Sequence, residues 1–349
     1  MLVYWEMTQA CGLACTHCRA EAMPCPHPLE LSTEQSKRFL SQLIEFGSPL
    51  PHLILTGGDP LGRSDIYPLI DYANGLGLEV SITPSATPLL TNEAIWKLKE
   101  HGIQSMGLSL DGSCAEKHDA IRAIPGTFDR TIAAAKHCGE IGMPIQVNTL
   151  VAEETANDLP AIYELLRTTF PVMRWSLFML ISVGRGKALN EVSPQEGENI
   201  MRWVFDLSQH SPFMVKTTEA PSYRRIAIEK MRISQMPTRE MKSSSVYQGF
   251  QIRDGHGIVF VSNLGDVYPS GFLPLRCGNV RNGSLVDIYR NSDTFRALHL
   301  PDQFHGKCGA CEYSHICGGS RARAFAYTGD LLGTDPFCPH EPVHHPVTA

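Results

Sequence analysis

The chain has 349 residues, of which 43% are hydrophobic and 19% charged, a composition typical of a globular protein with one large domain or two smaller ones. Lys and Arg number 30 against 36 Asp and Glu, so the formal charge of −6 argues against a nucleic-acid-binding surface. No run of about 18 apolar residues and no basic N-terminal leader is present, and we therefore expect a cytoplasmic protein without a membrane span.

Short apolar runs alternate with longer amphipathic stretches over the first 210 residues, a pattern typical of parallel βα units. The predicted strands are Leu2–Thr8, His52–Thr56, Glu79–Thr83, Ser105–Leu110, Ile145–Val151 and Arg174–Ile181. The predicted helices are Ser32–Phe46, Asp65–Gly75, Thr91–Glu100, Thr127–Ile141, Asn157–Phe170 and Pro194–Gln209. Six units are too few for a closed eight-stranded barrel, and they suit a partial barrel or an open doubly wound sheet.

The first predicted strand leads into three cysteines, Cys11, Cys15 and Cys18, in a CxxxCxxC spacing. In a reducing compartment, a chain with 11 cysteines uses thiolates for metals or catalysis more often than for disulfides. A structural or electron-transfer metal centre normally takes four protein ligands, so three cysteines leave one position for another group. Cys25 is the less favoured fourth ligand, because the prolines on either side of it suit a turn away from the site.

Glycine and polar residues follow the later predicted strands, at the edge where ligands gather in parallel sheets. These candidates are Gly57, Gly58, Asp59, Pro60, Ser81, Thr83, Ser109, Asp111, Asn148 and Arg185. Glycines at a strand end permit a sharp turn or a close approach of the backbone to a ligand. The alternative for each polar residue is that it only caps its strand.

The pattern changes near Ser211, where a polar connection with a helical stretch at Tyr223–Met236 follows the alternating units. Beyond it we predict a hairpin of Ile258–Ser262 and Val267–Tyr268. The predicted parts of the chain are residues 1–210, 211–250 and 251–349.

The last part supplies four more cysteines, Cys308, Cys311, Cys317 and Cys338. Four thiolates make a closed site, which suits electron transfer or structure better than ligand activation. Iron–sulfur clusters and zinc both accept four thiolates, so both are possible, and the cluster is favoured.

Three further features leave alternatives open. Glu6 is expected to face the barrel interior, where a buried carboxylate needs either a bound ligand or a structural ion pair. Cys277 is expected to be buried and inert, with a position in the substrate pocket as the alternative. The tail histidines His340, His344 and His345 are expected to be solvated rather than to bind a metal.

The cysteine spacing, its place after the first strand and the GGDP segment after the second together resemble the radical S-adenosylmethionine (radical SAM) superfamily. The resemblance implies a 4Fe-4S cluster on Cys11, Cys15 and Cys18, with S-adenosylmethionine (SAM) on its fourth iron and a 5′-deoxyadenosyl radical as the product of one-electron reduction. It also implies a low-potential reductant such as ferredoxin or flavodoxin. The SAM contacts that it implies are Gly57, Gly58, Asp59, Pro60, Ser81, Thr83, Ser109, Asp111, Asn148 and Arg185, with Asp59 in the place of the family's usual Glu.

The segment CGACEYSHICGGSRARA resembles the SPASM/Twitch extension of radical SAM enzymes, and implies an auxiliary 4Fe-4S cluster on the four C-terminal cysteines. A full SPASM domain carries a second auxiliary cluster, but Ser270 and residues 320–321 stand where two of its cysteines belong. We therefore predict one auxiliary cluster. The predicted fold is α/β, a partial (β/α)6 radical SAM barrel with a C-terminal SPASM/Twitch-like iron–sulfur extension.

Within the superfamily, the phrases YWEMTQAC, HCRAEA, VYPSGFLPLRCGNV and CEYSHICGGSRARA look most like the branch that makes heme and heme d1. The resemblance implies an oxidoreductase or lyase that abstracts hydrogen from a propionate or acetate side chain of an iron tetrapyrrole, followed by loss of carbon dioxide. Arg185, Arg321 and Arg323 are the candidates to pair with its carboxylates. The auxiliary cluster is expected to accept the electron left on the substrate.

Two alternatives remain. One is maturation of a ribosomally made peptide by thioether or carbon–carbon crosslinks, although no N-terminal peptide-recognition domain precedes the first strand. The other is a noncatalytic iron–sulfur electron carrier, which would need neither GGDP nor the SLD segment at Ser109–Asp111.

Overall fold

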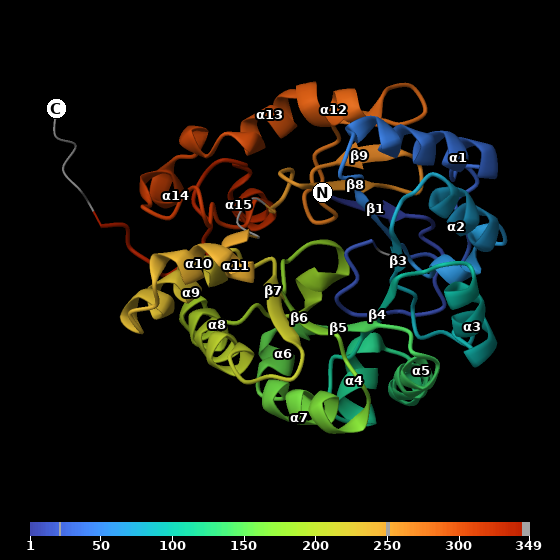
Figure 1. Cartoon of the computed structure of the whole chain (residues 1–349), viewed down its shortest axis with the longest axis horizontal. Coiled ribbons are helices and arrows are strands. Elements are labelled where there is room, and N and C mark those ends of the chain that lie inside the picture. The colour runs from blue at the N-terminus through green and yellow to red at the C-terminus, as the bar shows by residue number, and fades with distance from the viewer. Residues whose placement is uncertain (21, 249–251, 344–349) are drawn as a thin grey trace.

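The computed structural model describes residues 1–20, 22–248 and 252–343. Within these residues the strands form one ten-stranded sheet in the order β10-β9-β8-β1-β2-β3-β4-β5-β6-β7. Figure 1 shows the strands curving around the centre of the molecule with the helices on the outside. The sheet is therefore an open, partial barrel.

The barrel strands β1 to β7 all run parallel. They are β1 Leu2–Glu6, β2 His52–Thr56, β3 Val80–Ile82, β4 Ser105–Ser109, β5 Ile145–Val151, β6 Arg174–Met179 and β7 Met214–Thr218. The six predicted strands are confirmed, two with the predicted bounds and four with shorter ones. Strand β7 was missed, because its sequence MVKTT is short, carries a lysine and lies in the part that we predict as a helical connection.

Helices follow the strands along the chain. They are α1 Thr33–Gln42, α2 Ile66–Gly75, α3 Asn92–Glu100, α4 Ala115–Arg122, α5 Thr127–Ile141, α6 Glu153–Ala156, α7 Leu159–Thr169 and α8 Pro194–Ser208, with 3-10 turns η1 Leu43–Phe46, η2 Pro60–Gly62 and η3 Gly184–Ala188. The N-terminus of α1 has the predicted capping box between Ser32 and Gln35, and Thr91 caps α3. The short helices α4 and α6 were not predicted; α4 is polar along most of its length.

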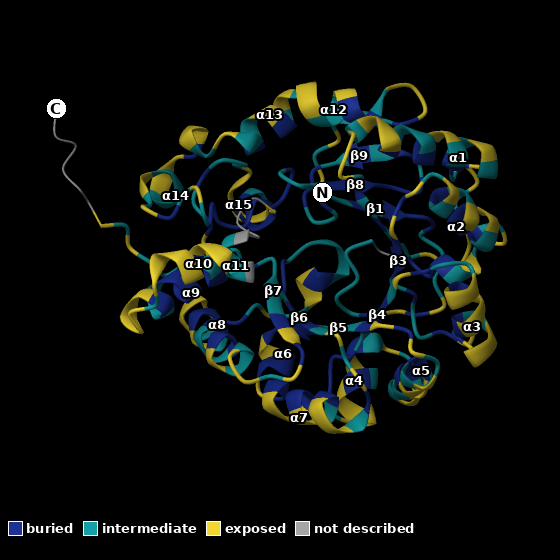
Figure 2. Cartoon of the chain, in the orientation of Figure 1, coloured by how far each residue is buried: buried dark blue, intermediate teal, exposed yellow. Residues whose placement is uncertain are grey.

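The core lies between the strands and the helices that cover them. Along β1, Val3 and Trp5 are fully buried against the helices, and Trp5 meets Phe39 of α1 edge to face with ring centroids 5.3 Å apart. Figure 2 shows the same division, with buried residues facing inward and exposed residues on the outer surfaces of the helices. Several side chains on the opposite face, such as Tyr4 and Asn148, are only half-buried, so solvent reaches the inside of the barrel.

The C-terminal part continues the same sheet. Strand β8, Ile258–Val261, pairs parallel with β1, so that Tyr4 lies opposite Phe260 and Trp5 opposite Val261. The predicted hairpin is formed by β8 and β9, and its turn contains Gly265 at φ 82°. The remaining elements are α9 Ser222–Ile233, α10 Thr238–Ser243, α11 Ser245–Gln248, β9 Asp266–Tyr268, β10 Gly278–Asn279, α12 Leu285–Asn291, α13 Asp293–His299, η4 Pro301–Gln303, α14 Gly306–Ala310 and α15 Arg321–Thr328.

The segment 211–250, which we predict as a helical connection, thus begins with a barrel strand before it becomes helical. No helix among the described residues is long and apolar enough to cross a membrane.

Candidate active site

The loop that carries the first three cysteines lies directly against the GGDP segment. The amide of Gly58 donates to the carbonyl of Thr8 at 2.7 Å, and the amide of Asp59 donates to the carbonyl of Ala10 at 2.7 Å. A Cβ atom on Gly58 would collide with the Ala10 carbonyl, and one on Gly57, at φ 152°, would collide with that of Thr8. Only glycines therefore allow the two loops to pair.

Asp59 and Pro60 complete this arrangement. The buried Asp59 carboxylate accepts hydrogen bonds from the Thr87 hydroxyl at 2.6 Å and from the Leu61 amide at 3.2 Å. Burial nevertheless raises the pKa of Asp59 above its ordinary value, and these hydrogen bonds only partly oppose the shift. Pro60 begins the turn η2. Asp59 thus holds the loops after β2 and β3 together.

The three thiols occupy different surroundings. Cys11 is half-buried, donates to Ser85 Oγ at 3.5 Å and accepts from the Leu13 amide at 3.3 Å. Cys15 is buried, and the Arg122 guanidinium donates to its sulfur at 3.7 Å. The amide of Cys18 bonds the Cys15 carbonyl at 3.3 Å, which turns the loop back on itself.

Burial raises the pKa of the Cys11 thiol. For Cys18, burial acts in the same direction, but hydrogen bonds from the Ala22 backbone and from Arg185 outweigh it and lower the pKa. Hydrogen bonds and a positive charge directed at sulfur are what a thiolate ligand requires. Cys25 is exposed.

Asp111 and Arg122 form a buried ion pair beside Cys15. Arg122 Nη2 lies 2.5 Å from Asp111 Oδ2, while Asp111 Oδ1 accepts the Leu150 amide at 2.7 Å. Burial would raise the pKa of Asp111, but the charge of Arg122 lowers it below its usual range. Asp111 was predicted as a SAM contact. In the structure its carboxylate is bonded to Arg122 and to the Leu150 amide, and it positions the Arg122 guanidinium. Sequence analysis missed Arg122, which no motif marks.

Arg185 has side-chain donors that are available to a ligand. Its amide donates to the Cys18 carbonyl at 3.0 Å, which fixes the start of η3 over the cysteine loop. Its Nε and Nη2 atoms are buried and have no hydrogen-bond partner among the described residues. Because buried donors without a partner are costly, these two nitrogens fit an anionic group of a bound molecule, such as a carboxylate.

The remaining predicted SAM contacts divide into two groups. Ser109 and Asn148 lie opposite each other in the sheet, and Gly107 lies beside Thr83 and Asn148, so these polar side chains share the barrel interior. Ser81 Oγ instead bonds His52 and Ser105, each at 2.8 Å, and both partners are the first residues of their strands. Ser81 therefore lies at the strand end opposite the cysteine loop.

Glu6 forms a structural ion pair. Its Oε1 atom lies 3.2 Å from Arg19 Nη2, and the Arg19 guanidinium also stacks 4.3 Å from the centre of the Phe260 ring. Nearby, Glu30 accepts from the Thr8 hydroxyl at 2.8 Å and from Asn263 Nδ2 at 3.1 Å. These contacts join the base of the cysteine loop to β8 and the turn after it.

The four C-terminal cysteines line one cavity together with Arg225, Lys307, Asp335 and His340. Three of their sulfurs accept backbone amides, from Asp335 to Cys308 at 3.3 Å, from Tyr313 to Cys311 at 3.4 Å and from Gly319 to Cys317 at 3.4 Å. Burial raises the pKa of Cys338 and of Cys317, the latter to about 12, so as thiols they hold their protons. Four converging sulfurs with amide donors fit a closed cluster that binds them as thiolates.

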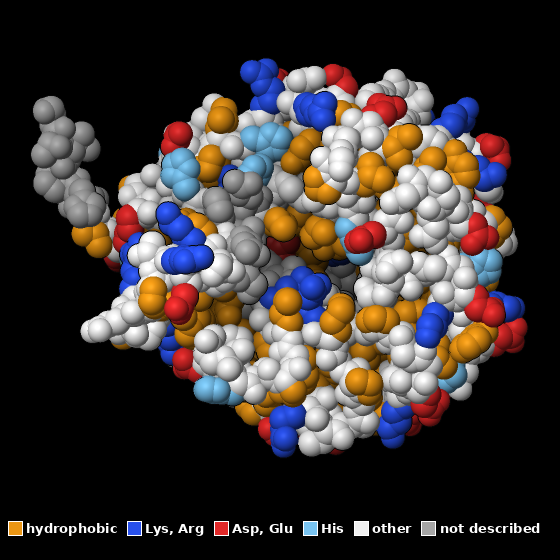
Figure 3. Space-filling model, viewed as in Figure 1, with side chains coloured by type: hydrophobic (Ala, Val, Ile, Leu, Met, Phe, Trp, Pro, Cys, Tyr) orange, Lys and Arg blue, Asp and Glu red, His pale blue; other side chains and the backbone are white. Residues whose placement is uncertain are grey.

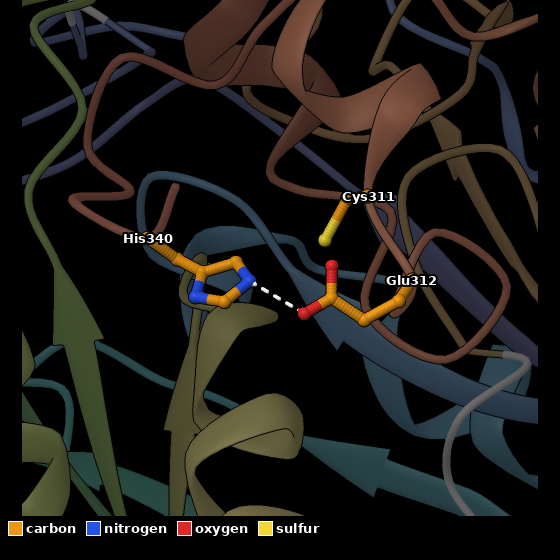
Figure 4. A group of neighbouring side chains, drawn as sticks. All are labelled: Cys311, Glu312 and His340. Atoms are coloured by element: carbon orange, nitrogen blue, oxygen red, sulfur yellow. Dashed lines mark hydrogen bonds and ion pairs between the residues drawn. The ribbon is translucent and has the colours of Figure 1, made fainter. Parts of the chain in front are cut away.

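Figure 4 shows a carboxylate and an imidazole beside this cavity. His340 Nε2 lies 3.0 Å from Glu312 Oε1, and ligand atoms of these two residues and of Cys311 lie within 4.8 Å of one another. His340 also packs against the Tyr313 ring with centroids 5.7 Å apart. The prediction of a solvated His340 is therefore wrong, because its ring is held by both contacts; His344 and His345 lie outside the described residues.

Arg321 and Arg323 were predicted to pair with substrate carboxylates, and this prediction is wrong. Arg321 donates to three carbonyls and to Cys308 Sγ, the last at 3.3 Å. Arg323 donates to Glu191 at 3.1 Å and to two carbonyls. Both side chains are essentially fully buried, and their donors are used by the protein. The sequence shows the charges but not these partners, which come from distant segments.

Ser270 and Ser320 have structural hydrogen bonds at the positions where a second auxiliary cluster would need cysteines. Ser270 Oγ accepts the Phe272 amide at 3.3 Å, and Ser320 Oγ caps α15 by accepting the Arg323 amide at 3.1 Å. Cys277 is half-buried and donates to the Leu275 carbonyl at 3.3 Å. A single auxiliary cluster stays a prediction.

Comparisons with known proteins agree with this arrangement. A family model described as "Radical SAM superfamily" matches residues 5–166. The AdoMet-dependent heme synthase of Methanosarcina barkeri is 37% identical over 346 residues, which cover 98% of this chain and 97% of the relative. The Fe-coproporphyrin III synthase of the same organism is 30% identical, with 97% of this chain and 87% of the relative covered.

Among solved structures, Streptococcus suis SuiB bound to S-adenosylmethionine matches with a TM-score of 0.73 at 16% identity, over 97% of this chain and 77% of that chain. At this identity the likeness is one of fold. It confirms the predicted architecture, a partial barrel with a C-terminal extension.

Proposed function

The chain belongs to the radical SAM superfamily, and on that premise we propose that it is a heme-forming enzyme that removes carbon dioxide from propionate side chains of an iron tetrapyrrole. The observation that carries the radical chemistry is the set of three thiols beside Arg185, which hydrogen-bonds Cys18 and whose buried Nε and Nη2 atoms have no partner among the described residues. The choice of substrate rests on the two relatives described above, which are both named for tetrapyrrole synthesis.

The donor sets fit the cofactors of this chemistry. Cys11, Cys15 and Cys18 would hold a 4Fe-4S cluster with one open position, and the four C-terminal cysteines would hold a second 4Fe-4S cluster with none. When bound, these groups and SAM supply a 5′-deoxyadenosyl radical that takes a hydrogen atom from the substrate, and an acceptor for the electron released when a double bond forms.

The bonds and electrons balance as follows. A hydrogen atom leaves the carbon of the propionate next to the macrocycle, the bond to the carboxylate breaks, carbon dioxide leaves and a vinyl group and one electron remain. Heme carries vinyl groups where its tetrapropionate precursor, iron-coproporphyrin III, carries propionates. This tetrapyrrole is therefore the substrate to test, with a low-potential protein such as ferredoxin or flavodoxin as the reductant.

The protein's own residues position these reactants. Arg185 would bind the carboxylate of SAM, because its amide bonds the Cys18 carbonyl and its Nε and Nη2 atoms have no partner among the described residues. Gly57 and Gly58 bring the loop after β2 against the cysteine loop, and Asp111 turns Arg122 toward Cys15. Asn148 and Ser109 line the barrel interior, where polar contacts to SAM are expected.

The decisive experiment is anaerobic reconstitution with iron and sulfide, followed by dithionite, SAM and iron-coproporphyrin III. We expect about eight irons per chain, formation of 5′-deoxyadenosine and a tetrapyrrole product lighter by carbon dioxide and two hydrogens for each vinyl group formed. A matched variant with Cys11, Cys15 and Cys18 changed to Ala should retain the C-terminal cluster absorbance and lose 5′-deoxyadenosine. Cleavage of SAM with no change in any tetrapyrrole would overturn the proposed substrate and favour the peptide alternative.

A further inference from the structure

Two cationic side chains, Arg174 and Lys216, share the inner face of the barrel. Lys216 lies opposite Ser176, which lies opposite Asn148, and Arg174 lies opposite Gln146. Arg174 Nη1 donates to Gln146 Oε1 at 3.2 Å, which confirms that its side chain lies on this face. Figure 3 shows Lys and Arg side chains in the hollow at the centre of the molecule, which β6 and β7 border in Figure 1.

Neither cation has an acidic partner among the described residues. Within residues 1–20, 22–248 and 252–343, Arg174 bonds Gln146 and has a buried Nε without a partner, and Lys216 has neither a hydrogen bond nor an ion pair. Burial, and then the charge of Arg174, lower the pKa of Lys216 to about 8. The two charges therefore repel each other, which is unfavourable unless an anion joins them.

Two acidic side chains on or next to the inner strands, Glu6 in β1 and Glu219 after β7, do not supply that anion. Glu6 is paired with Arg19. Burial and the nearby Asp254 raise the pKa of Glu219 to about 8, so this side chain is largely neutral at neutral pH. In the part of the chain that the structure describes, no acidic side chain is paired with the cations on the inner face of β6 and β7.

We propose that Arg174 and Lys216 bind a carboxylate of the tetrapyrrole that is not consumed in the reaction, and so fix the macrocycle in the barrel with another side chain toward the cysteine loop. This inference rests on the proposed function. The guanidinium of arginine can donate two parallel hydrogen bonds to one carboxylate, and the ammonium of lysine adds a compact positive charge.

The carboxylate of SAM is the other possible source of the anion. The substrate is favoured because Arg185, beside Cys18, already offers unpaired donors to SAM. Arg174 begins β6, whereas Arg185 follows the far end of the same strand, in η3. Two carboxylate-binding positions are thus separated along β6. One can bind the carboxylate of SAM, and the other can bind a carboxylate of a macrocycle that has acidic groups on several edges.

The test uses anaerobically reconstituted holoenzyme and follows the Soret band during titration with iron-coproporphyrin III and with its tetramethyl ester. Changing Arg174→Gln together with Lys216→Met should raise the dissociation constant of the tetra-acid about tenfold or more. The ester should bind the wild type and this double variant with the same, weaker affinity. The dissociation constant of SAM and dithionite-driven 5′-deoxyadenosine formation should not change. Lys136→Met on the exposed surface of α5 is the matched control and should bind like the wild type.

Folding is checked separately. Because the two cations repel each other, Lys216→Met should leave the melting temperature of the substrate-free holoenzyme unchanged or raise it, whereas a residue that only supports the fold would lower it. The charge-preserving variant Lys216→Arg should retain most of the affinity for the tetra-acid.

The outcomes distinguish failure of this inference from failure of the proposed function. Unchanged affinity for the tetra-acid in the double variant would overturn the inference and leave the proposed function standing. A weakened SAM affinity with unchanged tetrapyrrole binding would assign the pair to SAM and would also overturn it. If the wild type binds no tetrapyrrole, the proposed function fails, and this inference fails with it.

Discussion

Asp111 and Arg122 are joined by an ion pair of 2.5 Å that directs the other nitrogen of the Arg122 guanidinium toward the sulfur of Cys15. A positive charge at this distance favours the more negative, reduced state of any cluster bound through Cys15. Arg122 is therefore a positioning and tuning residue that touches a ligand rather than the substrate.

Replacing Arg122 with Gln should lower the midpoint potential of the first cluster by on the order of 50 mV, the one-electron equivalent of about 1 kcal/mol. The measurement is a redox titration of reconstituted protein followed by electron paramagnetic resonance. Arg122→Lys should recover part of the shift, because it restores the charge. An unchanged potential with normal iron content would contradict the electrostatic role.

Changing Gly58→Ala should disrupt the first cluster, because the new Cβ atom would meet the carbonyl of Ala10. Iron per chain should fall from about eight to about four, with loss of 5′-deoxyadenosine formation. Gly75→Ala is the matched control: nothing lies within 4 Å of its added Cβ, and alanine is the better helix former in α2. Full iron content in Gly58→Ala protein would show that the loops can separate without loss of the site.

Cys317→Ala should remove the second cluster and spare the first. Reductive cleavage of SAM should continue, but the substrate radical would lack its electron acceptor, so vinyl product should fall by tenfold or more while 5′-deoxyadenosine still accumulates. Cys277→Ala, outside both cysteine sets, should behave as the wild type. Product formation at the wild-type rate by Cys317→Ala protein would rule out an essential electron-accepting role.

The affinity for iron-coproporphyrin III should be constant below about pH 8 and fall above it, because Lys216 loses its charge there. Binding isotherms between pH 7 and 9.5 test this, and Lys216→Met should flatten the profile. Glu219, whose pKa is raised to about 8 by burial and by Asp254, ionises in the same range. Glu219→Gln separates its contribution from that of Lys216. An equally steep decline in Lys216→Met protein would assign the pH dependence elsewhere.

Stability should change with pH in the opposite direction. Lys216 has a folded pKa of about 8 against an ordinary value of 10.5, so the folded protein binds fewer protons than the unfolded chain between these values, and stability rises with pH across this window. At pH 7 Lys216→Met protein should have a higher urea midpoint than the wild type, by up to about 3 kcal/mol in unfolding free energy. By pH 9.5 the two curves should approach each other. A difference independent of pH would indicate a packing effect.

Periodicity and local spacing accounted for much of the structure. The apolar runs located the first six strands, and the capping box at Ser32 marked the start of α1, since both depend on neighbours in sequence. The two cysteine sets were identified from spacing and family resemblance. The C-terminal set lines one cavity, and the cluster on the first three cysteines stays a prediction.

Features that depend on distant partners were not predictable in this way. Nothing local distinguishes Arg185, with two unpaired nitrogens, from Arg321 and Arg323, in which every guanidinium nitrogen donates to a protein group. The cation pair of Arg174 and Lys216 depends on the register of two strands, one of which was missed. Charge is visible in a sequence, whereas the presence or absence of a counter-charge is a property of the fold.

Strand β1 has β2 on one side and β8 on the other, so the backbone that leads to the first cysteine loop is hydrogen-bonded to both parts of the chain. The C-terminal extension is consequently not a detachable module. A truncation before β8 would leave β1 as an unprotected edge strand, prone to pairing with other chains, at the base of the radical-generating site. Both cysteine sets therefore depend on the integrity of one continuous sheet.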